Sequence, residues 1–271
     1  MKIVLLITLI IPLNIFSQKN ILDSLKKEIA KNPKNISAKI LFAENLANTK
    51  PDTAISICNN IIKGSLQSDT IIGKAYNIIA NSFNTKQQTD TAEKMYIKAA
   101  EYFIKCNYYY GQAATLWNRA NMKRKKGQFN DANELLNIAE PLLLICNHEK
   151  KYTLLSGVYQ LLADNYQNIG FFEKAIENYY KSEKTIEHTQ DKIQYAVVYS
   201  GLGTMYTRMG EFPEAIKYYN QCIGISKQLN FISGIWNGSF NLASTFFQYS
   251  LYDSTRRNLL LDSGTIVSGF K

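Results

Sequence analysis

A short pattern that returns about every forty residues constrains the fold of this chain more than any other feature. The segment GEFPEAIKYY at 210–219 repeats the order of Gly, Phe, Ala, Ile and Tyr in GFFEKAIENYY at 170–180. The aligned positions are Ala54, Ala92, Ala132, Ala175, Ala215 and Thr255, and the residues four positions further on are Cys58, Tyr96, Leu136, Tyr179, Tyr219 and Leu259. Self-similarity at a fixed period is the signature of repeat proteins, so the sequence predicts six stacked units.

Each unit contains the pattern of two amphipathic helices joined by a tight turn. The first helix of the fifth unit has its core residues at i, i+3, i+4 and i+7, namely Tyr199, Leu202, Gly203 and Tyr206. Gly210 suits the left-handed position that ends a helix, and Pro213 suits the first turn of the next one. We expect the small residues Gly203 and Ala215 to let the two helices approach closely.

These residues resemble the tetratricopeptide repeat (TPR), whose pattern is W-x2-L-G-x2-Y followed by A-x3-F. The fifth unit matches it with Tyr199, Leu202, Gly203, Tyr206, Ala215 and Tyr219. The fourth matches with Tyr159, Leu162, Ala163, Tyr166, Ala175 and Tyr179, and the second with Tyr76, Ile79, Ala80, Phe83, Ala92 and Tyr96. The first, third and sixth units match less well, and the third has Arg119 and Lys123 at packing positions.

The resemblance covers residues 35–262 and implies an all-α, TPR-type α-solenoid, a right-handed superhelix of antiparallel helix pairs. About six repeats are expected, near 35–68, 73–106, 113–146, 156–189, 196–229 and 236–262. The spacing of about forty residues is similar to the longer TPR variant of kinesin light chains and bacterial regulators. A leading helix is predicted at 18–34, with Ile21, Leu22, Leu25 and Ile29 on one face, and a C-terminal tail at 263–271.

The first 17 residues are typical of a secretory signal peptide. Lys2 precedes an apolar run from Ile3 to Phe16, which is shorter than the ~20 residues that a membrane-spanning helix needs. We predict cleavage after Ser17 and an exported protein, periplasmic or secreted; the alternative is a short buried helix. With its leading helix and forty-residue units, the chain resembles the exported sensory region of bacterial TPR-linked histidine kinases.

The net charge of +9 favours acidic polymers, membrane surfaces or acidic proteins as partners. Nucleic acid is not expected, because export would separate it from this chain. The densest basic segment is KRKKGQ at 123–128. It is either a contact for an acidic partner or a solvated helix end. No transmembrane span is predicted once the signal peptide is removed.

The cysteines and histidines do not form a predicted disulfide or metal site. Cys106 and Cys146 fall at equivalent positions of adjacent units, about 10 Å apart, whereas a disulfide needs Cα atoms within ~7 Å. Cys58 and Cys222 lie in distant units, so four free and mostly buried thiols are expected. His148 and His188 lack neighbouring ligands at zinc-site spacing. With no catalytic motif in the sequence, we predict a protein that is not an enzyme and has no cofactor.

In TPR relatives the first helices line a concave groove, and the resemblance places a peptide-binding site there. The predicted groove residues are Asn77, Asn81, Asn84, Trp117, Asn118, Asn121, Arg124, Gln160, Asp164, Gln167, Arg208, Asn237, Phe240 and Asn241, with Thr204 and Phe247 at the same positions. An amide both donates to and accepts from a peptide backbone, and Trp or Phe can anchor a side chain. The alternative is that these are ordinary exposed polar residues.

A carboxylate clamp of the kind that holds chaperone tails is not expected. Asn81 and Asn118 match two of its positions, but Asn77, Gly157 and Leu161 replace the basic residues that it requires. Two function classes stay open. The first is a non-enzymatic module that binds a protein or peptide in the groove. The second is a sensory or regulatory module of a bacterial signalling system, a truncated or stand-alone relative of a TPR-linked histidine kinase.

Self-association is a further expectation for this chain. The sixth unit is followed by SGTIVSGFK and by no polar capping helix. Terminal repeats of a solenoid need a polar outer face to remain soluble. We therefore expect either that the array is truncated or that a partner or a second copy covers its C-terminal end.

Overall fold

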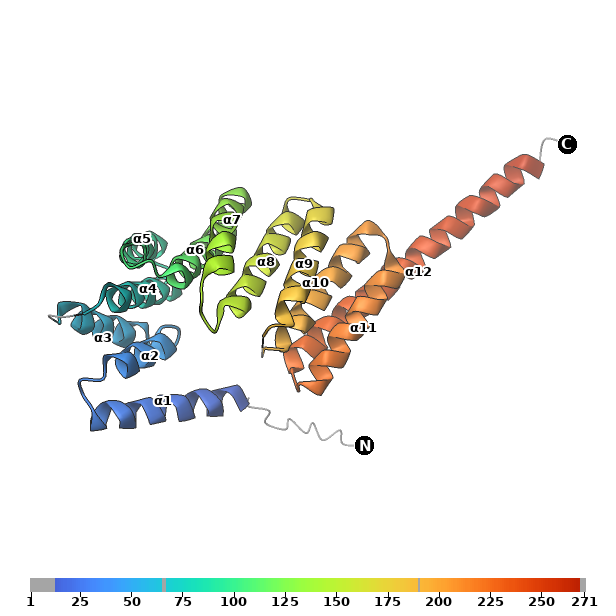
Figure 1. The fold of residues 1–271 in the computed structure, drawn as a ribbon. Coiled ribbons are helices and arrows are strands. Elements are labelled where there is room, and N and C mark those ends of the chain that lie inside the picture. The colour runs from blue at the N-terminus through green and yellow to red at the C-terminus, as the bar shows by residue number, and fades with distance from the viewer. Residues whose placement is uncertain (1–12, 65–66, 190, 269–271) are drawn as a thin grey trace, which may run out of the picture. The chain divides into compact units, whose positions relative to one another are not determined.

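A computed structural model describes residues 13–64, 67–189 and 191–268, which form twelve α-helices and no strand (Figure 1). The helices are α1 (Leu13–Lys31), α2 (Ile36–Leu46), α3 (Pro51–Lys63), α4 (Asp69–Thr85), α5 (Thr89–Lys105), α6 (Tyr109–Lys125), α7 (Phe129–Ile145), α8 (Lys151–Asn168), α9 (Phe172–Ile186), α10 (Ile193–Met209), α11 (Phe212–Gln228) and α12 (Ile232–Ser268). The all-α repeat fold predicted from the sequence is confirmed. Of the predicted signal peptide, residues 1–12 lie outside the described residues.

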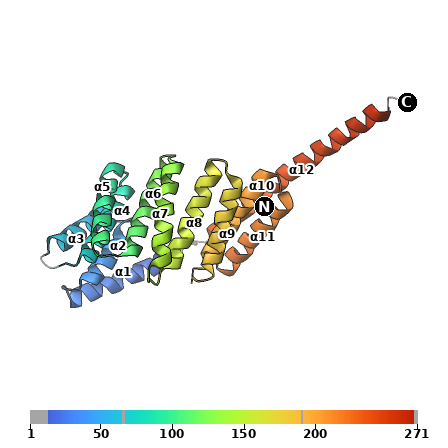
Figure 2. The ribbon, with the colours of Figure 1, turned by 45° about the horizontal axis from the view of Figure 1, so that its top comes forward.

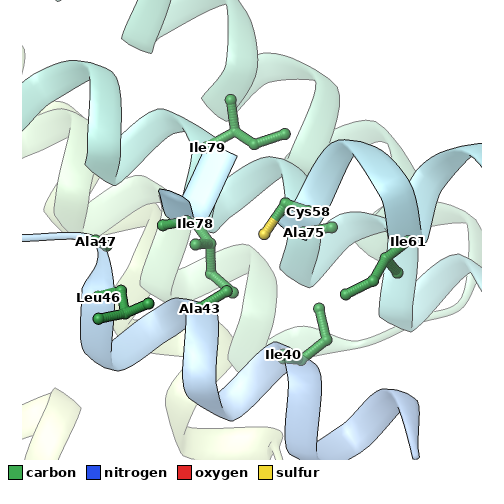
Figure 3. Packing of buried hydrophobic residues seen from close by; sticks show 10 residues of the cluster. Ile40, Ala43, Leu46, Ala47, Cys58, Ile61, Ala75, Ile78 and Ile79 are labelled. Carbon is green, nitrogen blue, oxygen red and sulfur yellow. The ribbon is translucent and has the colours of Figure 1, made fainter. Parts of the chain in front are cut away.

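The described helices belong to two compact units, which divide between Met122 and Lys123. From here on, the first and second units are these two parts of the chain, and the six sequence units are called repeats. In the first unit α1 packs on α2, and α3 packs on both α2 and α4. Figure 3 shows the core that α2, α3 and α4 share, in which Ile40, Leu46, Cys58 and Ile78 meet. Burial raises the pKa of the Cys58 thiol to about 12, so this cysteine is an inert part of the core.

The leading helix α1 begins at Leu13 and ends at Lys31. It therefore both starts and ends earlier in the chain than the predicted range of 18–34. Leu25 is buried, and Leu22 and Ile29 are half-buried, as their spacing predicts. Ile21, at the edge of this face, is 45% exposed.

In the second unit successive helices pack side by side from α7 to α12, as both ribbon views show (Figures 1 and 2). First helices also contact one another, α8 with α10 and α10 with α12. Tyr179, Leu202 and Met205 are among the buried residues of this core.

The aligned alanines pack where the helices of a pair cross. Ala54, Ala92, Ala132, Ala175 and Ala215 are completely buried, and the residues four positions further on, Cys58, Tyr96, Leu136, Tyr179 and Tyr219, are at most 3% exposed. Gly203 fills the equivalent place on the first helix, because a Cβ there would lie 2.8 Å from the Tyr219 ring. The predicted close approach of α10 and α11 is therefore confirmed.

The turn within a helix pair has the same geometry in repeats two to five. Gln87, Gly127, Gly170 and Gly210 all have positive φ angles. At Gly210 (φ 79°) the N–H of Glu211 bonds the carbonyl of Tyr206 at 2.9 Å, the six-to-one bond of a Schellman motif. Pro213 follows in the first turn of α11, as predicted.

The sixth repeat differs from the predicted helix pair, because α12 is one helix of 37 residues without a break. The position equivalent to Gly210 is Ser250, and the position equivalent to Pro213 is Asp253. Neither residue favours the left-handed turn or the proline at a helix start that separates the two helices of the fifth repeat. The expected tail at 263–271 is helical up to Ser268, and residues 269–271 are outside the described part.

Three of the four thiols, Cys58, Cys146 and Cys222, are buried, and Cys106 is half-buried, which confirms the predicted burial. The two histidines lie in connections between helices, where the ring of His188 is 4.8 Å from that of Tyr152. Among the described residues, no helix combines the length and the apolar character that crossing a membrane requires.

Candidate functional site

A cavity of about 280 Å³ opens between the first helices α8, α10 and α12 of the second unit. Its polar side chains are Asp164, Gln167, Ser200, Thr204 and Asn237, and its apolar surface includes Val197 and Phe231. Tyr179 and Cys222 reach it from the second helices α9 and α11. The cavity thus lies on the face where the sequence places the groove.

Two tyrosine hydroxyls hold polar residues of this cavity in place. Tyr179 Oη donates to Asp164 Oδ1 at 2.7 Å and lies 3.4 Å from Gln167 Oε1. Tyr219 Oη lies 3.1 Å from the Thr204 hydroxyl. Each second helix therefore orients a residue of the preceding first helix, fifteen positions earlier in the chain.

The first unit repeats this device once, and the third repeat lacks it. Tyr96 Oη donates to Asn81 Oδ1 at 2.5 Å, again across fifteen positions. In the third repeat the tyrosine is replaced by Leu136, and the side chain of Asn121 bonds the carbonyl of Trp117 on its own helix instead. The repeat tyrosine thus has two roles, one in the core and one as a hydrogen-bond donor to the groove face.

The electrostatics of the cavity centre on Asp164. Loss of water raises the pKa of its carboxyl group, and the Tyr179 hydrogen bond and the Arg124 charge partly offset this effect. Arg124 Nη1 lies 4.0 Å from Asp164 Oδ2, and the Asp164 side chain remains 42% exposed. Burial and the neighbouring carboxylate raise the pKa of Tyr179, so its hydroxyl stays protonated and donates. These groups can bind and orient a ligand.

The other predicted groove residues of the second unit lie outside the cavity lining. Gln160 Nε2 bonds the hydroxyls of Ser156 and Ser182 and the amide of Gln194. Arg208 is exposed near the end of α10, and Asn241 is half-buried on α12. Phe240 is 74% exposed on α12.

The predicted residues of the first unit form a separate polar set. Asn118 Nδ2 donates to Asn77 Oδ1 at 3.3 Å. Asn84 and Trp117 are half-buried, and the indole Nε1 of Trp117 is buried without a hydrogen-bond partner among the described residues. A cavity of about 420 Å³ in this unit lies elsewhere, between α1, α2 and α3, and is largely apolar.

The sequence prediction omitted several residues of the cavity. The positions that give Asn237 and Asn241 in α12 give Val197 and Gly201 in α10, both of which line the cavity. Selecting polar residues left out these small and apolar ones, although the same repeat positions identify them.

The basic segment at 123–128 is partly paired. Lys123 Nζ lies 3.5 Å from Asp131 Oδ2, and Arg124 faces Asp164. The side chains of Lys125 and Lys126 are exposed. Arg119, which with Lys123 occupies a packing position of the third repeat, forms an ion pair of 2.7 Å with Glu93. Within the described part of the chain, no three His, Cys, Asp or Glu side chains gather closely enough to hold a metal ion.

Comparison with known proteins finds a repeat family whose model matches part of this site. Residues 154–228 match the family model described as Tetratricopeptide repeat. The matched residues include most of α8 and all of α9, α10 and α11, and these helices contribute most of the cavity.

Solved structures share the TPR-type fold at low sequence identity. BtubC (BKLC) from P. vanneervenii is 15% identical with a TM-score of 0.63, covering 80% of this chain and 91% of that one. The apo form of RapI is 16% identical with a TM-score of 0.63, covering 90% and 70%. A Rap protein complexed with Competence and Sporulation Factor is 14% identical with a TM-score of 0.58, covering 87% and 72%.

Among curated proteins, the chain is similar to the Type II methyltransferase M.CeqI of Rhodococcus hoagii. The two are 28% identical over 106 residues, which is 39% of this chain. The matched segment spans only 19% of the length of the methyltransferase.

Proposed function

We propose that the cavity between α8, α10 and α12 binds a peptide or an exposed segment of a protein, and that the chain acts as a non-enzymatic binding module. The observation that carries this proposal is the pair of tyrosine hydroxyls behind the cavity. They fix Asp164 and Thr204 in position before a ligand arrives, which lowers the ordering cost of binding.

The chemistry of the cavity suits a segment with an exposed backbone and one apolar anchor. Asn237 offers both a donor and an acceptor, and Asp164 offers acceptors for backbone N–H groups. Val197 and Phe231 provide an apolar surface, and a volume of about 280 Å³ accommodates an anchoring side chain rather than a large cofactor.

The neighbouring charges indicate which ligands are favoured. Arg124 has a buried Nε that lacks a hydrogen-bond partner among the described residues, and Arg208 lies exposed at the end of α10. A ligand with an acidic group beside its apolar anchor would bond these guanidinium groups. The Rap structure named above was solved with a bound factor, which supports the use of this fold for ligand binding.

A displayed library of random peptides tests the proposal. Val197→Trp fills the cavity from a position that is 45% exposed, so the fold tolerates it, and peptide capture should fall by at least about tenfold. Asn220→Trp, on the exposed surface of α11, is the matched control and should capture as well as wild type. Equal capture by both variants would remove the cavity as the binding site.

We propose as a second candidate a regulatory module of a bacterial signalling system. The similarity to RapI and to the Rap complex supports it at the level of the fold. Affinity capture from the envelope fraction, followed by mass spectrometry, tests this candidate. Recovery of a kinase or response regulator would support it, and recovery of unrelated proteins alone would count against it.

The proposed location outside the cytoplasm rests on the sequence of residues 1–17. N-terminal sequencing of protein from a cell fraction tests it. A mature chain that begins at Gln18 would support export, and an intact Met1 in the cytoplasmic fraction would contradict it.

A further inference from the structure

The outward face of α12 carries a continuous apolar stripe. Trp236 is 73% exposed, Phe240 74%, Phe247 71% and Leu251 59%, and Ala243 between them is exposed as well. Successive members are three or four positions apart, the spacing that aligns side chains along one side of a helix. Such a stripe is the usual contact surface for another helix.

The opposite face of α12 already has its neighbours. The Thr245 hydroxyl is 2.9 Å from that of Thr207 on α10, and the ring of Tyr249 is 5.3 Å from that of Phe212 on α11. A Cβ at Gly238 would meet Ile223 on α11 at 2.8 Å. The stripe therefore points away from α10 and α11.

The stripe follows the face that a second helix covers in the fifth repeat. Ala243 is the equivalent of Gly203, which lies beneath the ring of Tyr219 on α11. Since α12 continues unbroken to Ser268, the described chain does not return to cover this face. Among the described residues, no other helix therefore covers this apolar surface.

We propose that this stripe joins two copies of the chain, with two α12 helices packed antiparallel about a two-fold axis near Ala243. Phe240 precedes Ala243 by three positions and Phe247 follows it by four, so an antiparallel partner places these phenylalanines opposite one another. Trp236 and Leu251 are paired in the same way one turn further out. The small Ala243 at the crossing lets the helices approach, and the surface is self-complementary as a two-fold interface requires.

Charge and area agree with a second copy as the occupant. Residues 232–252 contain no charged side chain, so two such stripes neither repel one another nor bury an ion. From the area that buried aromatic side chains typically cover, the stripe offers roughly 600 Å² per copy. Flanking side chains bring this close to the ~800 Å² per partner of a specific interface.

The mass of the full chain in solution tests the proposal. Light scattering should give twice the mass of one chain, and Phe240→Glu with Phe247→Glu should give one, with a dissociation constant raised by more than about 100-fold. Ile138→Glu, which changes a 55% exposed residue on α7, is the control and should leave the mass doubled. A wild-type chain of single mass, or a double variant that stays paired, would overturn the proposal.

A cysteine placed at the axis gives an independent reading should the double variant fail to fold. Ala243→Cys should form a covalent dimer on mild oxidation, because the two-fold axis brings its Cα atoms within disulfide range. Gln248→Cys is exposed on the same helix but off the stripe, and should form no more dimer than wild type. Equal cross-linking at both positions, or at neither, would contradict the antiparallel arrangement.

Discussion

Helices α10 and α12 begin alike and end differently, although both start a repeat. In α10, Gly203 and Thr204 lie against Tyr219 of α11. In α12 the equivalent residues are Ala243 and Ser244, both of which are exposed. The same sequence positions thus form a covered face in one repeat and an open face in the next.

The difference comes from a few residues at the turn rather than from the faces themselves. Gly210 adopts a left-handed conformation, and Pro213 starts α11. Ser250 and Asp253 stand at these positions in α12, and the helix continues through them. The break between helices, more than the apolar pattern, therefore decides which faces a repeat buries.

The largest expected effect on stability comes from the different burial of equivalent leucines in α10 and α12. Leu202→Ala removes a completely buried side chain and should lower the free energy of unfolding by about 3 kcal/mol. Leu242→Ala, at the equivalent and only half-buried position, should lower it by less than about 1 kcal/mol. Urea denaturation measures both, and equal losses would mean that α12 is packed as α10 is.

The next effect concerns the hydroxyl groups of Tyr179 on α9 and Tyr219 on α11, which have no counterpart at the equivalent position of α12, Leu259. Tyr179→Phe leaves a partly desolvated carboxylate without its donor and should cost about 2 kcal/mol of unfolding free energy. Tyr219→Phe should cost less than about 1 kcal/mol, because the Thr204 hydroxyl also bonds the carbonyl of Ser200 at 2.9 Å. A reversed order would show that these hydrogen bonds do not set the cost.

A smaller pair of changes tests the break itself. Gly210→Ala forces a side chain into a positive φ angle and should lower the free energy of unfolding by about 1 kcal/mol. Ser250→Ala, in the middle of a continuous helix, should raise it by up to about 0.5 kcal/mol. Thermal melts read out the sign, and a loss at both positions would indicate a turn at Ser250.

The smallest expected effect is the pH dependence of stability that the Asp164 carboxyl group on α8 causes. Its folded pKa is raised above the ordinary value of 3.8, so the protonated carboxyl group favours the folded state. This contribution is complete below pH 3.8 and is lost as the pH rises through the folded pKa. Asp164→Asn should therefore gain stability relative to wild type between acid and neutral pH. A difference that is the same at pH 3 and pH 7 would contradict the raised pKa.

Much of the fold could be predicted because the repeat positions are set by close packing. A buried alanine at a helix crossing tolerates little substitution in volume, so Ala92, Ala175 and Ala215 mark the crossings clearly. The length of α12 was missed because the apolar pattern continued in phase. Ser250 is compatible with both a turn and a helix, and only the missing glycine and proline indicated the difference.

The site could be predicted only as a face. The repeat positions located Asp164, Gln167 and Asn237, which share one cavity in the structure. They did not reveal that Gln160 bonds Ser156 and Ser182 instead. Which polar side chain is held inside and which faces a ligand depends on partners from other helices, and a single repeat pattern does not specify these.

Hydrogen exchange with and without a selected peptide tests where on the chain the ligand binds. We expect ligands to bind where α8, α10 and α12 meet, on the face that the tyrosines support from behind. Bound peptide should slow backbone amide exchange in these three helices and leave the exposed sides of α9 and α11 unchanged. Slower exchange confined to α9 and α11, with tight peptide binding, would contradict the account.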